Sequence, residues 1–240
     1  MRHILDISYK GTEFKGWQIQ PETRTVQGVL NDVLSRILQT NIETVGSGRT
    51  DTGVHAHQQI AHFDFSKELP EHLLHSVNSL LPHDVFVKSI DEVNKGFHAR
   101  FDAKYRSYKY YIQKDRSPFS VNQVSLFKPD VNLDLMNKAC DIIKKHKDFE
   151  AFSKVKTEVN NFNCEIFEAY WLQQNHQYIF YIKANRFLRG MVRALVGTML
   201  DIGTDRTSIE EFKQIIESKN RRKAGQAASP EGLYLLEVIY

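Results

Sequence analysis

A short glycine-rich loop carries the residues whose types and spacing could do chemistry. The run Gly46-Ser47-Gly48-Arg49-Thr50-Asp51-Thr52-Gly53 holds three glycines in eight residues. This density indicates a backbone with unusual torsions or one that a ligand approaches closely. Arg49 and Asp51 place opposite charges two positions apart and could act on a ligand held there. They could also form a surface ion pair on a solvated turn, worth less than ~1 kcal/mol, and the pattern alone leaves both interpretations open.

Three arginines near residue 190 form a second candidate site. Arg186, Arg189 and Arg193 recur at i, i+3 and i+7, which predicts a basic stripe along one side of a helix. An apolar stripe lies about 100° away on the same helix, and it is made of Leu188, Val192, Leu195 and Met199. The apolar side would pack and the basic side would meet anions. The alternative is a solvated polar face, the usual position of charges on a helix.

The histidine spacing does not predict a metal site. Eight of the ten histidines lie in residues 1–103, among them His55, His57 and His62. In a strand His55 and His57 share a face, whereas His62 points to the opposite face. No acidic residue is spaced to act as a third ligand. Because a metal site needs converging ligands, we expect no bound metal.

The elements that must position these residues follow from hydrophobic periodicity. Alternation over residues 2–9 predicts a strand. The spacing of apolar residues from Val26 to Leu38 predicts a helix with Thr25 as its N-cap. In the first half, further strands are expected at residues 42–46, 58–65 and 85–93, and a second helix is expected at residues 70–81. The order strand, helix, strand, strand, helix, strand is the ferredoxin-like pattern.

The second half repeats that order. The expected strands lie at residues 106–113, 163–173, 178–184 and 233–240, and the expected helices at residues 133–145, 187–202 and 208–217. We therefore predict two domains, 1–103 with the glycine-rich loop and 104–240, although no residue-by-residue repeat accompanies the repeated order. The predicted fold class is α+β, with two ferredoxin-like βαββαβ halves joined into a continuous, mostly antiparallel sheet. Helices would cover one side and leave an open surface on the other, across which a long flexible ligand could lie.

Composition is that of an ordinary globular protein. Of 240 residues, 41% are hydrophobic and 25% are charged, which excludes a disordered or collagen-like chain. No run approaches the ~20 apolar residues of a membrane span, and no apolar signal core begins the chain. We therefore expect a cytoplasmic protein without membrane association. Cys140 and Cys164 are the only cysteines, so a disulfide framework or cysteine-based zinc site has no support.

Charge separates the two halves. Residues 1–103 hold 10 Lys and Arg against 13 Asp and Glu, whereas residues 104–240 hold 22 against 16. The second half is therefore the basic half. This excess is compatible with a polyanionic partner, but many proteins that bind no polyanion share it.

The glycine-rich loop also resembles a family signature. The eleven residues from Gly46 to Ala56 are similar to the signature of the TruA-type tRNA pseudouridine synthases. Further motifs resembling that family follow in order along nearly the whole chain: Tyr9-Lys10-Gly11-Thr12 with Phe14, Gly16, Trp17 and Gln18; Phe97-His98-Ala99-Arg100-Phe101; Arg106-Ser107-Tyr108-Lys109-Tyr110; Asn185-Arg186-Phe187-Leu188 with Met191-Val192-Arg193 and Val196-Gly197; and Glu231-Gly232-Leu233-Tyr234-Leu235. The resemblance implies an isomerase that converts uridine to pseudouridine at positions 38, 39 and 40 of the tRNA anticodon stem-loop. It also implies that the surface opposite the helices is an RNA-binding cleft.

The resemblance implies roles for four side chains. Uridine and pseudouridine are isomers, so the reaction needs a nucleophile but no cofactor and no metal. In the family the nucleophile is the Asp of Arg-Thr-Asp, here Asp51, and the cation that keeps it ionised is the Arg of Met-Val-Arg, here Arg193. Arg49 assists the extrusion of the uridine from the RNA stack, and Tyr108 lies against the extruded uracil. Without the resemblance, Tyr108 and Tyr110 would be interpreted as core aromatics on one strand face.

Residues 97–101 resemble an RNA-contacting segment of the family. Arg100 is the expected phosphate ligand, whereas Phe97 and Phe101 are better suited to the core. The further RNA contacts that the resemblance implies are Phe97, His98, Ala99, Phe101, Arg186 and Arg189.

Three functions compete on the sequence. The leading hypothesis is a tRNA pseudouridine synthase that works as a homodimer and holds tRNA across both subunits. A non-catalytic RNA-binding protein of the same fold would use only the open sheet and basic cleft, and the intact Arg49-Thr50-Asp51 triplet argues against it. An aspartate-dependent hydrolase would need a metal-ligand set or a phosphate-binding loop, which the motifs do not provide.

Overall fold

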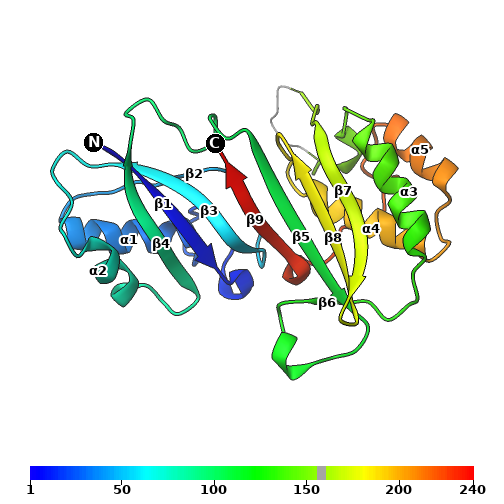
Figure 1. The fold of residues 1–240 in the computed structure, drawn as a ribbon, viewed down its shortest axis with the longest axis horizontal. Helices are drawn as coiled ribbons and strands as arrows, with labels where there is room; N and C mark the ends of the chain where they lie inside the picture. Colours follow the sequence, from blue (N-terminus) through cyan, green and yellow to red (C-terminus); the bar gives the residue numbers. More distant parts are fainter. Residues whose placement is uncertain (156–160) are drawn as a thin grey trace. The chain divides into compact units, whose positions relative to one another are not determined.

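The chain forms two compact units, as the computed structural model of residues 1–155 and 161–240 shows (Figure 1). The first unit comprises Met1–Lys104 together with Tyr234–Tyr240, and the second comprises Tyr105–Leu233. The strand pairs are mostly antiparallel and helices accompany each unit, so the α+β class is confirmed. Among the described residues, no helix is both long enough and apolar enough to cross a membrane.

The first unit contains a sheet that follows the predicted order of elements. From one edge its strands are β4 (Val85–Val93), β1 (Arg2–Tyr9) and β3 (His55–Asp64), followed on the other edge of β3 by the two-residue β2 (Val45–Gly46) and by β9 (Leu233–Ile239). The sequence grouped the last strand with the second half. It belongs instead with the first unit, because His55 and Ala56 pair in parallel with Tyr234 and Leu235.

Two helices cover one face of this sheet. Every second side chain of β1 is buried, namely His3, Leu5, Ile7 and Tyr9. The unit's helices are α1 (Val26–Leu38) and α2 (Leu73–Leu80), and α1 runs behind β1 and β4 in Figure 1. The predicted N-cap of α1 is confirmed, since Thr25 Oγ1 accepts a hydrogen bond from the Gly28 N–H at 3.2 Å.

The strand predicted at residues 42–46 is wrong for its first three residues. Ile42 donates its N–H to Ser35 Oγ at 2.8 Å. Thr44 donates both its N–H and its hydroxyl to Asn31 Oδ1, at 3.0 and 2.7 Å. Side chains of α1 therefore occupy the donors that strand pairing would need. The next strand, β3, begins at His55, three residues earlier than the sequence predicts.

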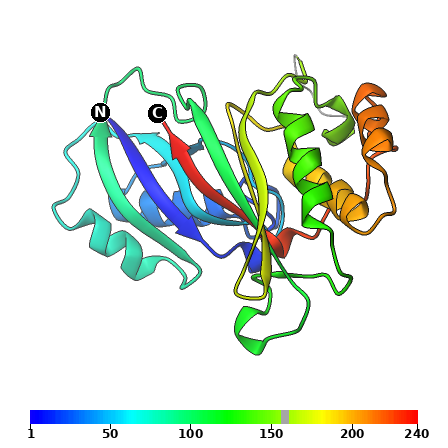
Figure 2. The same ribbon diagram turned by 45° about the vertical axis from the view of Figure 1, so that its right-hand side comes forward.

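The second unit packs three helices against its own strands. Its antiparallel strands are β5 (Tyr105–Gln113), β8 (Gln177–Ala184) and β7 (Ile166–Gln174), with the two-residue β6 (Ser125–Leu126) parallel to β5. Its helices are α3 (Leu133–Lys144), α4 (Met191–Gly203) and α5 (Ile209–Glu217), which gather to one side of β7 and β8 in Figure 2. Tyr110, Phe180 and Trp171 are cross-strand neighbours and form the buried face.

The helix predicted at residues 187–202 begins four residues later. Gly190 is its N-cap in the left-handed region, at φ +71°. The preceding turn is tied down by a hydrogen bond from the Lys154 N–H to the Arg189 carbonyl at 2.9 Å. Arg186 and Arg189 therefore lie in this turn and not on the helix. The predicted basic stripe is wrong, and only Arg193 belongs to α4.

Candidate active site

The Asp51 loop, residues 47–54, connects β2 to β3 and is fixed to β3 at its start. Ser47 donates its N–H to the Ile60 carbonyl at 2.7 Å and its hydroxyl to Gln59 Oε1 at 2.5 Å. Gln59 in turn donates its amide to the Gly48 carbonyl at 3.0 Å. Ser47 and Gln59 are fully buried. The loop therefore leaves the sheet in a defined direction before it reaches its charged residues.

Residues 14–17 support the centre of the loop. Trp17 donates its N–H to the Thr50 carbonyl at 3.2 Å, and Gly53 donates its N–H to the Phe14 carbonyl at 3.2 Å. Gly16 has a φ of +89°, and a Cβ added there would lie 2.5 Å from the Thr50 oxygen. This position therefore requires glycine for both torsion and space. Gly16 and Trp17 belong to a motif that resembles the family, but the sequence alone predicts no role for them. Hydrogen bonds between residues 33 or more positions apart leave no periodic signal.

The two charged residues of the loop are less buried than Thr50, which lies between them. Thr50 is 7% exposed, whereas Asp51 is half-buried and Arg49 is exposed. The Asp51 carbonyl accepts a hydrogen bond from the Val54 N–H at 3.2 Å, which closes a turn directly after the carboxylate. The backbone that carries Asp51 is therefore fixed by its neighbours, and the residue itself stays half-buried.

The nearby histidines have structural roles. The His55 ring is buried, its Nδ1 accepts the Gly11 N–H at 3.0 Å, and it stacks on Tyr234 at 4.5 Å between centroids. His62 Nδ1 accepts the Ala99 N–H at 3.2 Å. Burial and the nearby Arg2 guanidinium lower the pKa of His62 to about 4. Within residues 1–155 and 161–240, no group of three His, Cys, Asp or Glu is arranged to hold a metal ion.

Residues 97–102, the FHARFD segment, form hydrogen bonds with three other residues of the first unit. Arg2 donates to the Phe97 carbonyl at 2.7 Å, and the Tyr240 hydroxyl donates to the Ala99 carbonyl at 2.6 Å. The third tie is the hydrogen bond from Ala99 to His62. Arg2 also pairs with Asp64 and holds the pKa of that carboxyl below its usual value.

This segment corrects two predictions. Phe101 was expected in the core, but it is 73% exposed, and the guanidinium of the exposed Arg100 lies 5.4 Å from its ring centroid. The ring of His98 lies 4.3 Å from that of Phe101. Ala99 was expected to contact RNA, but it is fully buried and offers no side-chain surface. Phe97 is half-buried, against Tyr240 at 4.8 Å.

In the second unit the structure distinguishes the two tyrosines of β5. Tyr110 is fully buried and donates its hydroxyl to the Ser229 carbonyl at 2.8 Å. Burial raises the pKa of Tyr110. Tyr108 is half-buried and meets Phe187 edge to face, with centroids 5.0 Å apart. Tyr110 is therefore a core residue, whereas Tyr108 keeps surface for a flat ligand.

Arg193 lies in the first turn of α4 and is half-buried. Its Nε donates to the Ala228 carbonyl at 2.6 Å, and its own carbonyl accepts the Ala228 N–H at 2.9 Å. Helix α4 also approaches the backbone of Gln226, two residues before Ala228. A Cβ added at Gly197 would lie 1.8 Å from the Gln226 oxygen. The position of Arg193 is thus set by both its side chain and its backbone. Of the other predicted contacts, Arg186 is half-buried and Arg189 is exposed.

Comparison with known proteins adds an independent line of observation. A family model described as tRNA pseudouridine synthase matches residues 7–102 and 146–240. Those ranges include Arg49, Asp51, Arg100 and Arg193, and Tyr108 lies between them. A protein of Parabacteroides distasonis called tRNA pseudouridine synthase A is 42% identical over 241 residues, covering 100% of this chain and 96% of the relative. Proteins of the same name from Porphyromonas gingivalis and Caldicellulosiruptor saccharolyticus are 40% and 41% identical, covering 100% of this chain and 97% and 100% of the relatives.

Proposed function

This chain belongs to the TruA-type tRNA pseudouridine synthase family and isomerises uridine to pseudouridine in tRNA, and we propose that its targets are uridines 38, 39 and 40 of the anticodon stem-loop. The observation that carries the proposal is the Asp51 loop, which lies within the eleven residues similar to the family signature and in which Asp51 is half-buried. The rigid backbone around Asp51 supports a catalytic use of that carboxylate.

The chemistry explains why one carboxylate is enough. The bond from ribose C1′ to N1 of uracil breaks, the base turns, and C5 forms the new bond to C1′. The C5 proton is lost and N1 gains one, so no atom is added and no redox change occurs. Asp51 serves as the nucleophile that activates the nucleoside, because a carboxylate is ionised at neutral pH and forms an ester-like bond that can be released. This balance calls for no cofactor or metal.

Four other side chains assist Asp51 in this proposal. Arg193 supplies a positive charge for the Asp51 carboxylate, and the bond from its Nε to the Ala228 carbonyl supports a fixed position for the guanidinium. Arg49 assists the extrusion of the uridine, since a planar guanidinium stacks on bases and bonds phosphate. Tyr108 stacks against the extruded uracil, and Arg100 binds a phosphate.

The proposal also includes weaker RNA contacts. The exposure of Phe101 beside Arg100 and His98 supports a surface that contacts bases and phosphates. Phe97, Arg186 and Arg189 complete the proposed set. Ala99 is left out because it is buried.

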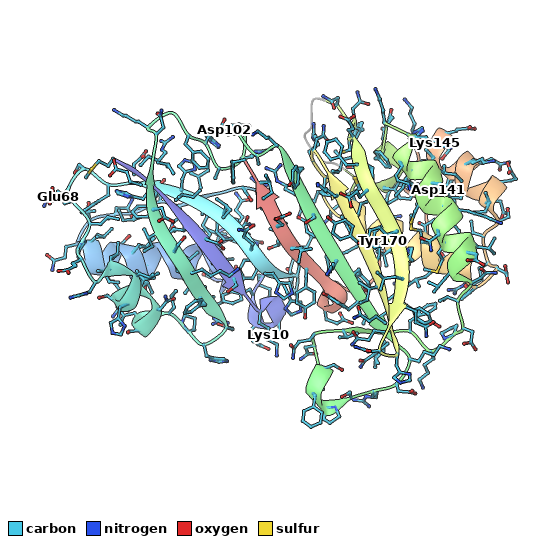
Figure 3. All side chains as sticks on the ribbon, viewed as in Figure 1. Lys10, Glu68, Asp102, Asp141, Lys145 and Tyr170 are labelled. Carbon is cyan, nitrogen blue, oxygen red and sulfur yellow. The ribbon has the colours of Figure 1, made fainter. Side chains whose placement is uncertain are left out.

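The open face of the second unit's sheet supports a homodimer. Tyr170 on β7, labelled in Figure 3, is 40% exposed and stacks on Tyr181 with centroids 5.1 Å apart. Phe167 on the same strand is 45% exposed. Exposed aromatic clusters are typical of protein contacts. Light scattering of Tyr170→Glu should report a monomer, and a wild-type protein that is monomeric at micromolar concentration would contradict the dimer.

The cytoplasm is the proposed location. Both cysteines, Cys140 and Cys164, are free and buried, and burial raises the pKa of the Cys140 thiol to about 12. Thiols in this form are compatible with a reducing compartment.

Incubation with unmodified tRNA tests the proposal directly. Separate transcripts carry a single uridine at position 38, 39 or 40, and a control transcript carries cytidine at all three. In each of these transcripts we expect pseudouridine at the one uridine among positions 38, 39 and 40, and none elsewhere. The control transcript should contain no pseudouridine. Pseudouridine only at other positions would contradict the site assignment. Stable tRNA binding without any pseudouridine would instead favour a non-catalytic RNA-binding protein.

A further inference from the structure

We infer that Tyr9 is a positioning residue for the Asp51 loop, an inference that rests on the proposed role of Asp51. Tyr9 is the last residue of β1, and Thr50 directly precedes Asp51. The two hydroxyl oxygens lie 2.8 Å apart and form a hydrogen bond. Tyr9 is 5% exposed and Thr50 is 7% exposed. The bond therefore joins a strand of the sheet to the residue beside the nucleophile, away from water.

Thr50 is held at its backbone as well as its side chain. Its carbonyl accepts the Trp17 N–H at 3.2 Å. Gly16, at φ +89°, lets the same carbonyl approach to a distance that a Cβ would block. The carbonyl of Thr50 belongs to the peptide group that leads into Asp51. Fixing that peptide group and the Thr50 side chain together sets the direction of the Asp51 Cα–Cβ bond.

A single substitution, Tyr9→Phe, removes the Tyr9 hydroxyl and keeps the ring. A buried hydroxyl that loses its partner still carries the free-energy cost of desolvation. Rotation of the Thr50 side chain toward another hydrogen-bond partner would lower that cost. Displacement of a reacting group by about 1 Å costs on the order of 100-fold in rate. The exposed Arg100, which would bind a phosphate, lies outside the Asp51 loop, and the exposed Arg49 side chain takes no part in this bond. Its loss should therefore reduce kcat and leave the KM for tRNA nearly unchanged.

The Tyr9 ring has a separate, structural role that the test must keep intact. Its centroid lies 6.3 Å from that of Trp17, at an interplanar angle of 35°. Tyr9→Phe retains this packing and removes only the hydroxyl. Thr50→Val removes the partner hydroxyl with little change in shape, whereas Thr50→Ser retains it. These three variants separate the hydrogen bond from the bulk of either side chain.

Steady-state kinetics on an unmodified tRNA transcript test the inference. Tyr9→Phe and Thr50→Val should each lower kcat about tenfold or more, with KM within about twofold of wild type. Thr50→Ser should restore most of the rate. The double variant Tyr9→Phe/Thr50→Val should be no slower than either single variant, because both remove the same bond. Tyr178→Phe is the matched control: it removes the hydroxyl of a residue only 8% exposed in β8, and it should leave kcat unchanged.

Two results would overturn the inference. One is a Tyr9→Phe enzyme that is folded and has the wild-type kcat. The other is a loss of kcat in Tyr9→Phe and Thr50→Val that accompanies a loss of folded protein and that also occurs in Thr50→Ser. In that case the bond would only stabilise the fold. A wild-type enzyme that forms no pseudouridine would instead contradict the proposed function, so the two failures are distinguishable.

Discussion

The Asp51 loop and the FHARFD segment are both irregular segments of the first unit, and both are held by hydrogen bonds to its other residues. They present different groups to solvent. The Asp51 loop is held by Tyr9, Trp17 and Gln59, and it presents a half-buried carboxylate. The FHARFD segment is held by Arg2, His62 and Tyr240. It presents Phe101 and Arg100, both exposed.

Under the proposed function, the Asp51 loop serves catalysis and the FHARFD segment serves RNA binding. Bonds to the Asp51 loop act on the residues on either side of one carboxylate, where small displacements change a reaction rate. Bonds to the FHARFD segment hold the exposed Phe101 and Arg100, which in this proposal contribute contact area and charge to RNA binding. Substitutions at the first region should therefore lower the rate at saturating tRNA. Substitutions at the second should raise the concentration of tRNA that saturation requires.

The largest effect short of removing Asp51 is expected from Gly16→Ala. The added Cβ would lie 2.5 Å from the Thr50 oxygen, at a φ of +89°. The loop must shift, so kcat should fall on the order of 100-fold, and the free energy of unfolding should drop by ~1–3 kcal/mol. Steady-state kinetics and thermal melting measure both. Gly96→Ala is the control, since its nearest neighbour would lie 3.7 Å away, and equal losses in the two variants would contradict this account.

Tyr108→Ala should give the next largest effect. Loss of a base stack costs ~1–3 kcal/mol, which lowers kcat/KM by about 5- to 150-fold. Tyr108→Phe should keep most of that contribution because it retains the ring. If Tyr108→Ala folds and turns over tRNA at the wild-type kcat/KM, Tyr108 does not contact the uracil.

Arg100→Ala should weaken binding more than catalysis. Each phosphate contact that is lost should reduce the slope of log K against log salt by roughly 0.7 to 0.9. Filter binding at several salt concentrations measures this slope. Arg36, 65% exposed on α1, provides a control for the loss of any surface arginine. An Arg100→Ala slope equal to that of Arg36→Ala would remove Arg100 from the proposed RNA contacts.

The smallest effect is a pH dependence of stability that arises from His62, which accepts the Ala99 N–H of the FHARFD segment. The pKa of His62 is lowered from its ordinary 6.5 to about 4, first by burial and then by Arg2 and His98, while Asp64 and Asp102 oppose the shift. The unfolded chain therefore takes up a proton that the folded protein does not, and stability should fall as pH drops from 6.5 toward 4. The expected loss is about 1 kcal/mol between pH 6.5 and 5.5.

Denaturant unfolding of wild type and His62→Asn at several pH values measures that contribution. The substituted amide oxygen keeps an acceptor for the Ala99 N–H but does not titrate. The pH slope should therefore be shallower in His62→Asn. Identical slopes in the two proteins would show that His62 does not titrate as described.

Local signals in the sequence predicted most elements, and they singled out the glycine-rich loop that carries Arg49 and Asp51. The N-cap at Thr25, the alternation along β1 and the glycine-rich loop all lie within a few neighbouring residues, and the structure has each of them. Two elements differ because side chains or a torsion override periodicity. Asn31 and Ser35 take the donors of residues 42 and 44, and Gly190 delays the start of α4.

Long-range contacts account for the rest. Phe101 was predicted in the core from its type, but the bonds that place its segment come from residues 2, 62 and 240. The pairing of β9 with β3 joins residues about 180 positions apart. The bond between Tyr9 and Thr50 spans 41 positions. No periodic pattern in one sequence reports such contacts.

Tritium release from tRNA labelled at uridine C5 tests the division between the two regions most directly, because the reaction expels the C5 hydrogen. The measurement uses Asp51→Asn and Arg100→Ala side by side, each at increasing enzyme in excess over tRNA, with filter binding on the same samples. We predict that Asp51→Asn binds tRNA and releases no tritium at any concentration, whereas Arg100→Ala reaches the wild-type rate once binding is saturated. Tritium release by folded Asp51→Asn, or a rate for Arg100→Ala that stays low at saturation, would contradict the account.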